Sequence, residues 1–227
     1  MEKRYSRNIS TLSEEENNKL KDFNVCILGC GGIGGYVIEM LSRIGIEHLT
    51  LVDMDVFDES NLNRQIISSE DNIGTFKVES ARNRVKSINS NTKVRVFNGE
   101  FCEENAYEIL KEHDIIVDCL DSIENRILLQ KISKELNIPF VHGAIGGWYG
   151  QVSSVFPGDD TLNKIYKNNN VGIEKKLGNP SFTPATIASI QVSEVIKILL
   201  KKGDILRNKL LRIDLLYNDY DIIELEK

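Results

Sequence analysis

The feature that most constrains the fold of this 227-residue chain is a glycine cluster near its start. The sequence Gly-Cys-Gly-Gly-Ile-Gly occupies positions 29–34, directly after a short apolar run and directly before an amphipathic stretch. Glycines between a strand and a helix let the backbone approach a phosphate closely, and the start of the helix supplies unpaired N–H groups. No Gly-Lys-Ser/Thr sequence follows, so the loop is not a Walker loop. We therefore expect a phosphate-binding strand–loop–helix unit in which Gly29, Gly31, Gly32 and Gly34 contact the ligand.

Strands and helices alternate through the first two thirds of the chain. Short apolar runs predict strands, and apolar residues at helical spacing predict helices between them. The expected strands are 25–29, 49–53, 93–98, 114–120 and 139–144, and the expected helices are 32–45, 75–89, 103–112 and 122–136. This alternation is typical of an α/β fold with a Rossmann-like, mostly parallel, doubly wound sheet.

The last third of the chain follows a different pattern. A strand is expected at 151–156, a strongly amphipathic helix at 184–200, and a closing pair of strands at 210–215 and 221–225. We expect these to form a mixed or antiparallel extension of the sheet. The stretch between 158 and 183 is polar, rich in Asn and Gly, and long enough to predict a functional or mobile loop. We interpret residues 1–227 as one domain, with an N-terminal arm (1–22), a nucleotide-binding half (23–145) and a mixed-sheet half (146–227).

Composition excludes several classes of protein. Hydrophobic residues make up 41% and charged residues 27%, which is typical of a globular protein, and the net charge of −6 argues against general nucleic-acid binding. No apolar run reaches the roughly 18 residues of a membrane span, and the polar N-terminus lacks a signal-peptide core, so we expect a cytoplasmic protein. The four cysteines form no Cys-x-x-Cys pair, which predicts neither a disulfide framework nor a structural zinc site.

Asp53 ends the second expected strand, 19 residues after Gly34. In a Rossmann-like sheet, a carboxylate at this place binds ribose hydroxyls. The glycine loop and Asp53 alone would favour an NAD-dependent oxidoreductase.

Cationic and polar residues downstream favour a nucleotide triphosphate instead. The segment 53–65 reads DMDVFDESNLNRQ and includes Arg64, and Lys77 follows twelve residues after it. A triphosphate gains much from a bidentate Arg and a compact Lys charge, whereas a nicotinamide ring gains little. Asp118 and Asp121 close the fourth expected strand, where parallel sheets bind ligands. Asp121 is the better candidate for a Mg²⁺ ligand, and Asp118 equally fits a role in bracing the strand.

At this point the sequence resembles the ThiF/MoeB/HesA family, the bacterial relatives of ubiquitin-activating enzymes. The resemblance runs from about residue 4 to the C-terminus. The combination of Asn61-Leu62-Asn63-Arg64-Gln65 with Lys77 is far more specific than the glycine loop. The other matching segments are 4–9 (RYSRNI), 29–34, 77–81 (KVESA), 118–121 (DCLD), 142–144 (HGA), 150–152 (GQV) and 194–197 (EVIK).

The resemblance implies an ATP-dependent adenylyltransferase that activates the C-terminal Gly-Gly carboxylate of a ubiquitin-like sulfur carrier, as in thiamin or molybdopterin synthesis. It also implies ATP and Mg²⁺ as ligands and a homodimer as the working form. Arg7 would match an N-terminal arginine that reaches the partner subunit's ATP. In the same way, Asp53 would bind the ribose, Asp121 would hold Mg²⁺, and the phosphate and nucleotide contacts would come from Asp55, Asn61, Arg64, Gln65 and Lys77.

The chain departs from this family in its cysteines. Many members carry two Cys-x-x-Cys pairs for zinc and a reactive cysteine in the crossover loop, and this sequence has neither. We therefore expect no zinc and no covalent capture of the carrier by that loop. Cys30 and Cys119 are interpreted as small buried residues. Three other functions are alternatives: a tRNA-modifying relative, which the acidic charge disfavours; an NAD-dependent oxidoreductase; and an inactive carrier-binding scaffold.

Overall fold

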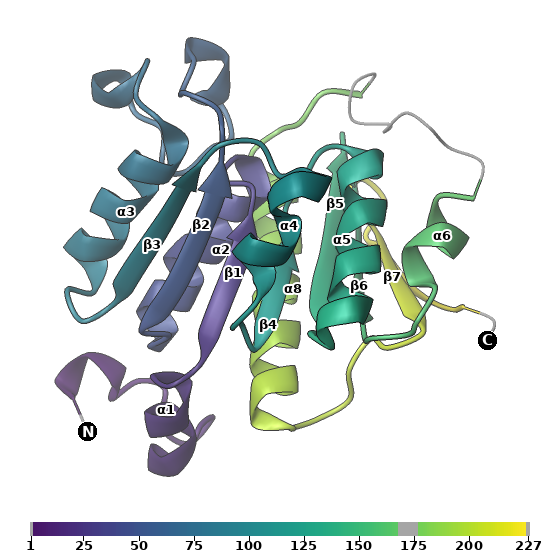
Figure 1. The fold of residues 1–227 in the computed structure, drawn as a ribbon, viewed down its shortest axis with the longest axis horizontal. Coiled ribbons are helices and arrows are strands. Elements are labelled where there is room, and N and C mark those ends of the chain that lie inside the picture. Colours follow the sequence, from purple (N-terminus) through teal and green to yellow (C-terminus); the bar gives the residue numbers. More distant parts are fainter. Residues whose placement is uncertain (1, 168–176, 226–227) are drawn as a thin grey trace.

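The computed structural model describes residues 2–167 and 177–225. One eight-stranded sheet runs through the molecule, with helices on both faces (Figure 1). The strand order is β3-β2-β1-β4-β5-β6-β7-β8. Five strands are parallel, and they are β1 (Asn24–Leu28), β2 (His48–Asp53), β3 (Lys93–Asn98), β4 (Ile115–Asp118) and β5 (Phe140–Gly146). The other three continue the sheet as antiparallel neighbours, namely β6 (Tyr149–Val155), β7 (Lys209–Asp214) and β8 (Asp219–Glu224).

Helices cover the two faces of the sheet in two groups. One group consists of α2 (Gly32–Ile44), α3 (Lys77–Ile88) and α8 (Phe182–Leu200), whose apolar residues form one core cluster with the sheet. The short α1 (Glu14–Leu20) packs against α8 at the edge of this group. The other group consists of α4 (Glu103–Leu110) and α5 (Ile123–Leu136), with α6 (Thr161–Ile165) beside α5. Single 3₁₀ turns lie at Lys3–Tyr5, Glu59–Asn61 and Glu70–Asn72.

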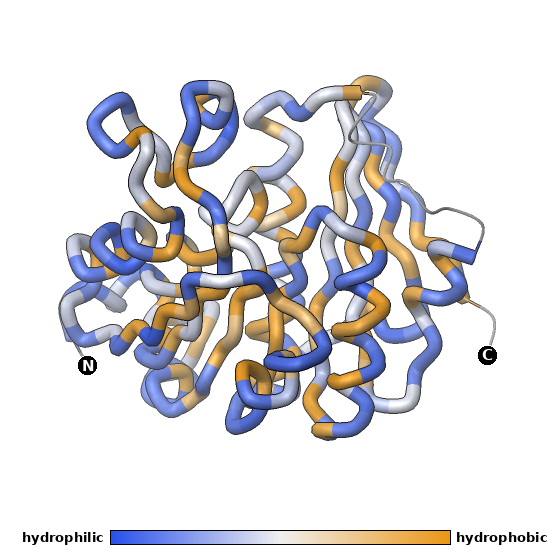
Figure 2. The backbone as a smooth tube through the Cα atoms, turned by 45° about the horizontal axis from the view of Figure 1, so that its top comes forward, coloured by the Kyte–Doolittle hydropathy of each residue, from blue (hydrophilic) through white to orange (hydrophobic). Residues whose placement is uncertain are grey.

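The central strands form the core because they are apolar on both faces. Residues 25–28 of β1 and all of β4 are fully buried, as expected for parallel strands between two helical layers. Hydrophobic segments run through the middle of the molecule, whereas hydrophilic residues gather in the loops around it (Figure 2). The expected α/β fold, with a parallel sheet and an antiparallel extension, is confirmed.

One difference from the expected elements concerns the second half. The short helix α6 forms inside the stretch that was expected to be a loop, with Leu162 buried under it. Residues 168–176 of the same stretch lie outside the described part of the chain, so the expectation of mobility is untested there. Helix α8 is long and apolar enough to cross a membrane by length and composition alone, but half of its most apolar window is buried. It packs against α2, β5 and β6, as a core helix does.

The sheet reverses its winding between β1 and β4. The chain leaves β1 toward α2 on one face, and it leaves β4 toward α5 on the other. Loops that follow two such strands diverge and open a crevice at the carboxyl edge of the sheet, where α/β proteins bind ligands. The glycine loop follows β1, and the segment Cys119–Asp121 follows β4.

Candidate nucleotide-binding site

A cavity of about 520 Å³ opens at this switch point. Its walls come from the loops after β1, β2, β3 and β4, and from the first turns of α2, α3 and α5. Ten of the twelve residues that the sequence singled out lie in this one wall, namely Gly29, Gly31, Gly32, Asp53, Asp55, Asn61, Arg64, Gln65, Lys77 and Asp121. The other two, Gly34 and Arg7, are not part of it.

The glycine loop brings helix α2 close to the crevice with its N-terminus uncapped. Gly29 has a φ of +97°, and a Cβ atom there would lie 2.5 Å from the carbonyl oxygen of Cys119 on the neighbouring loop. Gly31 is the N-cap residue and offers no side chain to cap the helix, so the first N–H groups of α2 have no side-chain cap. Gly34 serves packing instead, because its Cβ would lie 1.8 Å from the carbonyl oxygen of Gly29.

Asp53 joins the end of β2 to the glycine loop. Its Oδ2 accepts a hydrogen bond from the N–H of Cys30 at 2.7 Å, and its Oδ1 accepts one from the N–H of Asp55 at 2.8 Å. Burial raises the pKa of Asp53 above its ordinary value, although these two N–H groups and Lys77 partly offset that effect. Each carboxylate oxygen accepts more than one hydrogen bond, so the group retains capacity for a ligand hydroxyl.

Lys77 is more deeply buried than Arg64, the other cation on the glycine-loop side of the cavity. It is 7% exposed, and its Nζ lies 2.7 Å from Oδ2 of Asp55, which is half exposed. Helix α3 begins at Lys77, so the backbone N–H of Lys77 has no partner within the helix. It donates to the carbonyl oxygen of Asp55 instead. Asp55, in the loop after β2, therefore holds both the backbone N–H and the ammonium group of Lys77.

The segment after β2 places three more polar side chains beside the glycine loop. Asn61 and Gln65 are buried, and Gln65 lies against Gly31. Within the described residues, Oε1 of Gln65 is buried and has no hydrogen-bond partner. This oxygen is therefore available to accept a hydrogen bond from a ligand. Arg64 is half-buried, and its Nη1 donates to the carbonyl of Ser60 and to Asn63.

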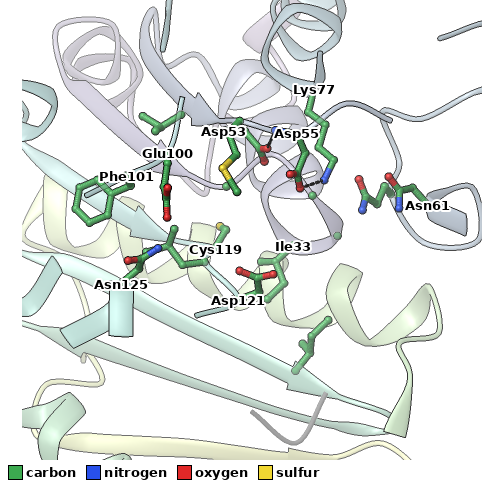
Figure 3. Close-up of a pocket in the computed structure, with 18 of the residues that line it drawn as sticks. Ile33, Asp53, Asp55, Asn61, Lys77, Glu100, Phe101, Cys119, Asp121 and Asn125 are labelled. Carbon is green, nitrogen blue, oxygen red and sulfur yellow. Dashed lines mark hydrogen bonds and ion pairs between the residues drawn. The ribbon is translucent and has the colours of Figure 1, made fainter. Parts of the chain in front are cut away.

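The two carboxylates after β4 have separate environments. Asp118 is fully buried, and its Oδ2 lies 2.7 Å from Nδ1 of His142 on β5. Asp121 is exposed, lies beside Ile33 of α2, and faces the cavity (Figure 3). In the described part of the chain, no group of three or more His, Cys, Asp or Glu side chains is placed to hold a metal ion. A cation here would therefore depend on Asp121 together with oxygens of a bound ligand.

Several residues of the wall were missed by the sequence analysis, among them Glu100, Phe101, Asn125 and Arg126. Glu100, Phe101 and Asn125 lie on the opposite side of the cavity from Lys77 and Asn61, and Asp53 and Asp121 lie between the two groups (Figure 3). Asn125 and Arg126 belong to the first turn of α5, and that position after a strand end is the signal that could have found them.

The cysteines near the cavity are poor nucleophiles. Burial raises the pKa of the Cys30 thiol and the pKa of the Cys119 thiol well above the ordinary value, which keeps both protonated. Cys119 is half-buried and Cys30 fully buried. Their sulfur atoms therefore have no thiolate character with which to attack a ligand.

Arg7 is exposed and lies at the other end of the subunit from the cavity. Tyr5, two residues before it, receives a hydrogen bond on its hydroxyl from Asn89, at the end of α3 far from the carboxyl edge of the sheet. The N-terminal segment and α1 lie at that end of the strands (Figure 1). Arg7 therefore does not reach the cavity of its own subunit in this conformation.

Comparison with known proteins gives a consistent family match. The model of the ThiF family matches residues 5–227. The SAMP-activating enzyme E1 of Haloferax volcanii is 32% identical over 217 residues, which are 93% of this chain and 80% of that protein. The molybdopterin-synthase adenylyltransferase of Haemophilus influenzae is 33% identical over 222 residues, which are 94% of this chain and 90% of that protein.

A solved structure shares the fold. The crystal structure of Escherichia coli MccB with ATP superposes with a TM-score of 0.85 at 24% sequence identity. The match covers 100% of this chain and 73% of that one.

Proposed function

This chain belongs to the ThiF family of adenylyltransferases, and from that premise we propose that it activates the C-terminal carboxylate of a ubiquitin-like sulfur carrier with ATP. In the proposed reaction, a carboxylate oxygen of the carrier attacks the α-phosphorus of ATP. The bond from that phosphorus to the bridging oxygen breaks, and pyrophosphate leaves with the electron pair. The products are a carrier acyl-adenylate and pyrophosphate.

The observation that carries this proposal is the convergence of the uncapped α2 N-terminus with Arg64, Lys77 and Asp121 on one cavity. A carboxylate that attacks a polyanion is repelled by it, so catalysis depends on positioning and on neutralising charge. The helix N-terminus, Arg64 and Lys77 supply positive potential where the phosphates would lie. In this arrangement the ribose meets Asp53, and the base lies toward Glu100, Phe101 and Asn125.

The charges in the cavity favour a divalent cation with the nucleotide. Lys77 is already paired with Asp55, and Arg126 lies 3.8 Å from Asp118. The wall also contains Glu100 and Asp121, so its cations do not by themselves balance a triphosphate. Mg²⁺ is usually held by one or two carboxylates and by substrate phosphates, and Asp121 fits that pattern. When bound, the cation would neutralise phosphate charge.

The carrier is proposed from the relatives, whose names refer to SAMP activation and to molybdopterin synthase. We propose a partner of the ThiS or MoaD type that ends in Gly-Gly and serves thiamin or molybdopterin-type cofactor synthesis in the cytoplasm. A thin, flexible Gly-Gly tail is the shape that reaches a phosphate at the base of a crevice. Burial raises the pKa of both cysteine thiols near the cavity, which supports an enzyme that stops at the adenylate.

We also propose that the working form is a homodimer. Arg7 lies far from the cavity of its own subunit, so a contribution to the phosphates requires a second copy of the chain. In a dimer with two-fold symmetry, each Arg7 would reach the partner's cavity, and the two contacts would be equivalent.

Carrier-dependent ATP–pyrophosphate exchange tests the proposed reaction. Purified carriers that end in Gly-Gly are compared with the same carriers lacking the tail, with and without Mg²⁺. Exchange that needs both the intact tail and Mg²⁺ is expected, and Asp121→Ala should abolish it. ATP binding without exchange for every carrier would contradict the proposed reaction, and unchanged exchange in Asp121→Ala would contradict the role of that carboxylate.

A further inference from the structure

A cluster of buried polar side chains lies directly behind the cavity wall formed by the β4–α5 turn. Its members come from five different elements or their ends, and the phosphate contacts proposed above do not use them. We call it the buried polar cluster, and it consists of Asp118, Arg126, His142, Gln151 and Tyr166. Asp118 and His142 are fully buried, and Arg126 is 3% exposed.

The cluster holds the residue that precedes Asp121 from both sides. Oδ1 of Asp118 accepts a hydrogen bond from the N–H of Leu120 at 3.0 Å. Nη2 of Arg126 donates to the carbonyl oxygen of Leu120 at 2.5 Å. Both peptide groups of Leu120 are thereby fixed, and the second of them leads directly into Asp121.

Asp121 has no comparable support of its own. Its side chain is exposed and makes no hydrogen bond or ion pair to any other residue that the structure describes. The direction in which its carboxylate points into the cavity therefore depends on the backbone of the β4–α5 turn.

His142 and Tyr166 close the chain of hydrogen bonds. Burial lowers the pKa of His142 despite its contact with Asp118, which favours the neutral ring. Nδ1–H then donates to Asp118, and Nε2 accepts from the Tyr166 hydroxyl at 3.1 Å. The same hydroxyl accepts from Nη1 of Arg126 at 3.0 Å and from Nε2 of Gln151 at 3.2 Å. One oxygen thus connects three members of the cluster.

Tyr166 also carries this connection to a distant part of the sequence. It follows helix α6 directly, and it lies 40 residues from Arg126 along the chain. The hydroxyl therefore ties the segment after α6 to the turn that presents Asp121.

We propose that Arg126 and Tyr166 are positioning residues that hold the β4–α5 turn so that Asp121 presents its carboxylate to a cation bound with the nucleotide. This proposal rests on the proposed function, because it needs the cavity to bind a nucleotide with its cation. Arg126 sets the turn through the Leu120 carbonyl, and Tyr166 sets the orientation of Arg126.

Tyr166→Phe is the main test variant, because it removes the hydroxyl and retains the ring. Ser133→Ala is the matched control: Ser133 is buried on the same helix as Arg126, and its hydroxyl donates to the Ile138 carbonyl at the far end of α5. The Tyr166 hydroxyl makes three hydrogen bonds to described residues and the Ser133 hydroxyl makes one, so thermal unfolding of both variants measures how much stability each one loses. Only Tyr166→Phe is expected to affect the cation.

The first readout is binding of ATP by calorimetry, with Mg²⁺ and with excess EDTA. In Tyr166→Phe and Arg126→Lys, the affinity gained on adding Mg²⁺ is expected to fall about tenfold, whereas affinity in EDTA stays unchanged. Exchange turnover should fall by a similar factor, and the Mg²⁺ concentration for half-maximal rate should rise. Ser133→Ala is expected to match the unaltered protein in all three measurements.

Asp121→Asn, alone and combined with Tyr166→Phe, separates this proposal from the function on which it rests. If Tyr166 acts through Asp121, the double variant loses no more Mg²⁺ dependence than Asp121→Asn alone. Tyr166→Phe behaving like Ser133→Ala, while Asp121→Asn loses Mg²⁺ dependence, would overturn the positioning role only. Absence of any Mg²⁺ effect in the unaltered protein would contradict the proposed function instead.

Discussion

Nζ of Lys77 lies 2.7 Å from the carboxylate of Asp55, and the two partners differ sharply in burial, at 8% and 55% side-chain exposure. The lysine is thus held at the cavity by a partner that is largely in solvent. A half-exposed ion pair of this kind contributes about 0–1 kcal/mol to the free energy of unfolding. The pair is therefore better explained as positioning of the Lys77 charge than as stabilisation of the fold.

Lys77→Ala should reduce carrier-dependent exchange by at least about 100-fold, because it removes a fixed charge from a site where charge develops. Asp55→Asn should cost about tenfold or less, because Lys77 keeps its backbone anchor and loses only the ion pair. Steady-state exchange kinetics with varied ATP measures both. An Asp55→Asn loss as large as that of Lys77→Ala would show that Asp55 acts on the nucleotide directly.

Two glycines of the same loop should respond differently to a methyl group. In Gly34→Ala the new Cβ would lie 1.8 Å from the Gly29 carbonyl oxygen, so the helix and strand must separate. We expect a loss of about 3 kcal/mol or more in the free energy of unfolding, because overpacking of backbone cannot relax by rotamer change. In Gly32→Ala the nearest atom is 3.7 Å away, on Pro184, so that variant should fold normally and weaken ATP binding instead.

Chemical denaturation and ATP titration distinguish these outcomes. Equal unfolding free energies for the two glycine variants would contradict the packing role of Gly34. Unchanged ATP affinity in a folded Gly32→Ala would contradict the close approach of phosphate to this part of the loop.

Acid should destabilise the protein through two histidines, the buried His142 and the half-buried His113. Burial lowers the pKa of His142 and of His113 below the ordinary value of 6.5. As the pH falls through 6.5, these histidines therefore bind protons in the unfolded chain before they do so in the folded protein. The free energy of unfolding decreases below that pH. The maximum slope is about 1.4 kcal/mol per pH unit for each histidine. Asp53 acts in the opposite sense, because its pKa is raised in the folded state.

Thermal unfolding between pH 7.5 and 5.5 measures this dependence. His142→Gln should be less stable at pH 7.5, because it disrupts the contact with Asp118, but its stability should change less with pH. His113→Gln should reduce the remaining slope further. A slope unchanged in the double variant would show that other groups cause the acid sensitivity.

The parts of this molecule that the sequence predicted are those whose signals are local. The glycine loop, Asp53 and Asp121 each lie at or just beyond the end of a strand of recognisable apolar pattern, so the parallel sheet places them at one edge. Arg64 and Lys77 were proposed from their charge beside a glycine loop, whereas Asn61 and Gln65 were found by family resemblance. The structure brings all four to the same cavity.

The buried polar cluster could not be predicted in this way. Arg126 and Tyr166 meet across 40 residues, and each has an ordinary setting in the sequence. Helix α6 was missed for a related reason, because it has only five residues and buries Thr161 and Leu162 alone. Its position depends on tertiary contacts, including the Gln130 side chain that accepts from the Leu162 N–H.

The proposed dimer predicts that two inactive variants restore each other. Arg7→Ala retains its own cavity, and Asp121→Ala retains its own Arg7, so a mixed dimer contains one cavity with both groups intact. Each variant alone should lose nearly all exchange activity. A heterodimer purified with two different tags should recover about half of the activity of the unaltered dimer, because one of its two sites is complete. The two homodimers, purified in the same way, serve as controls. An inactive heterodimer would show that Arg7 serves its own subunit. If light scattering shows that the fully active protein is a monomer, the shared site is contradicted.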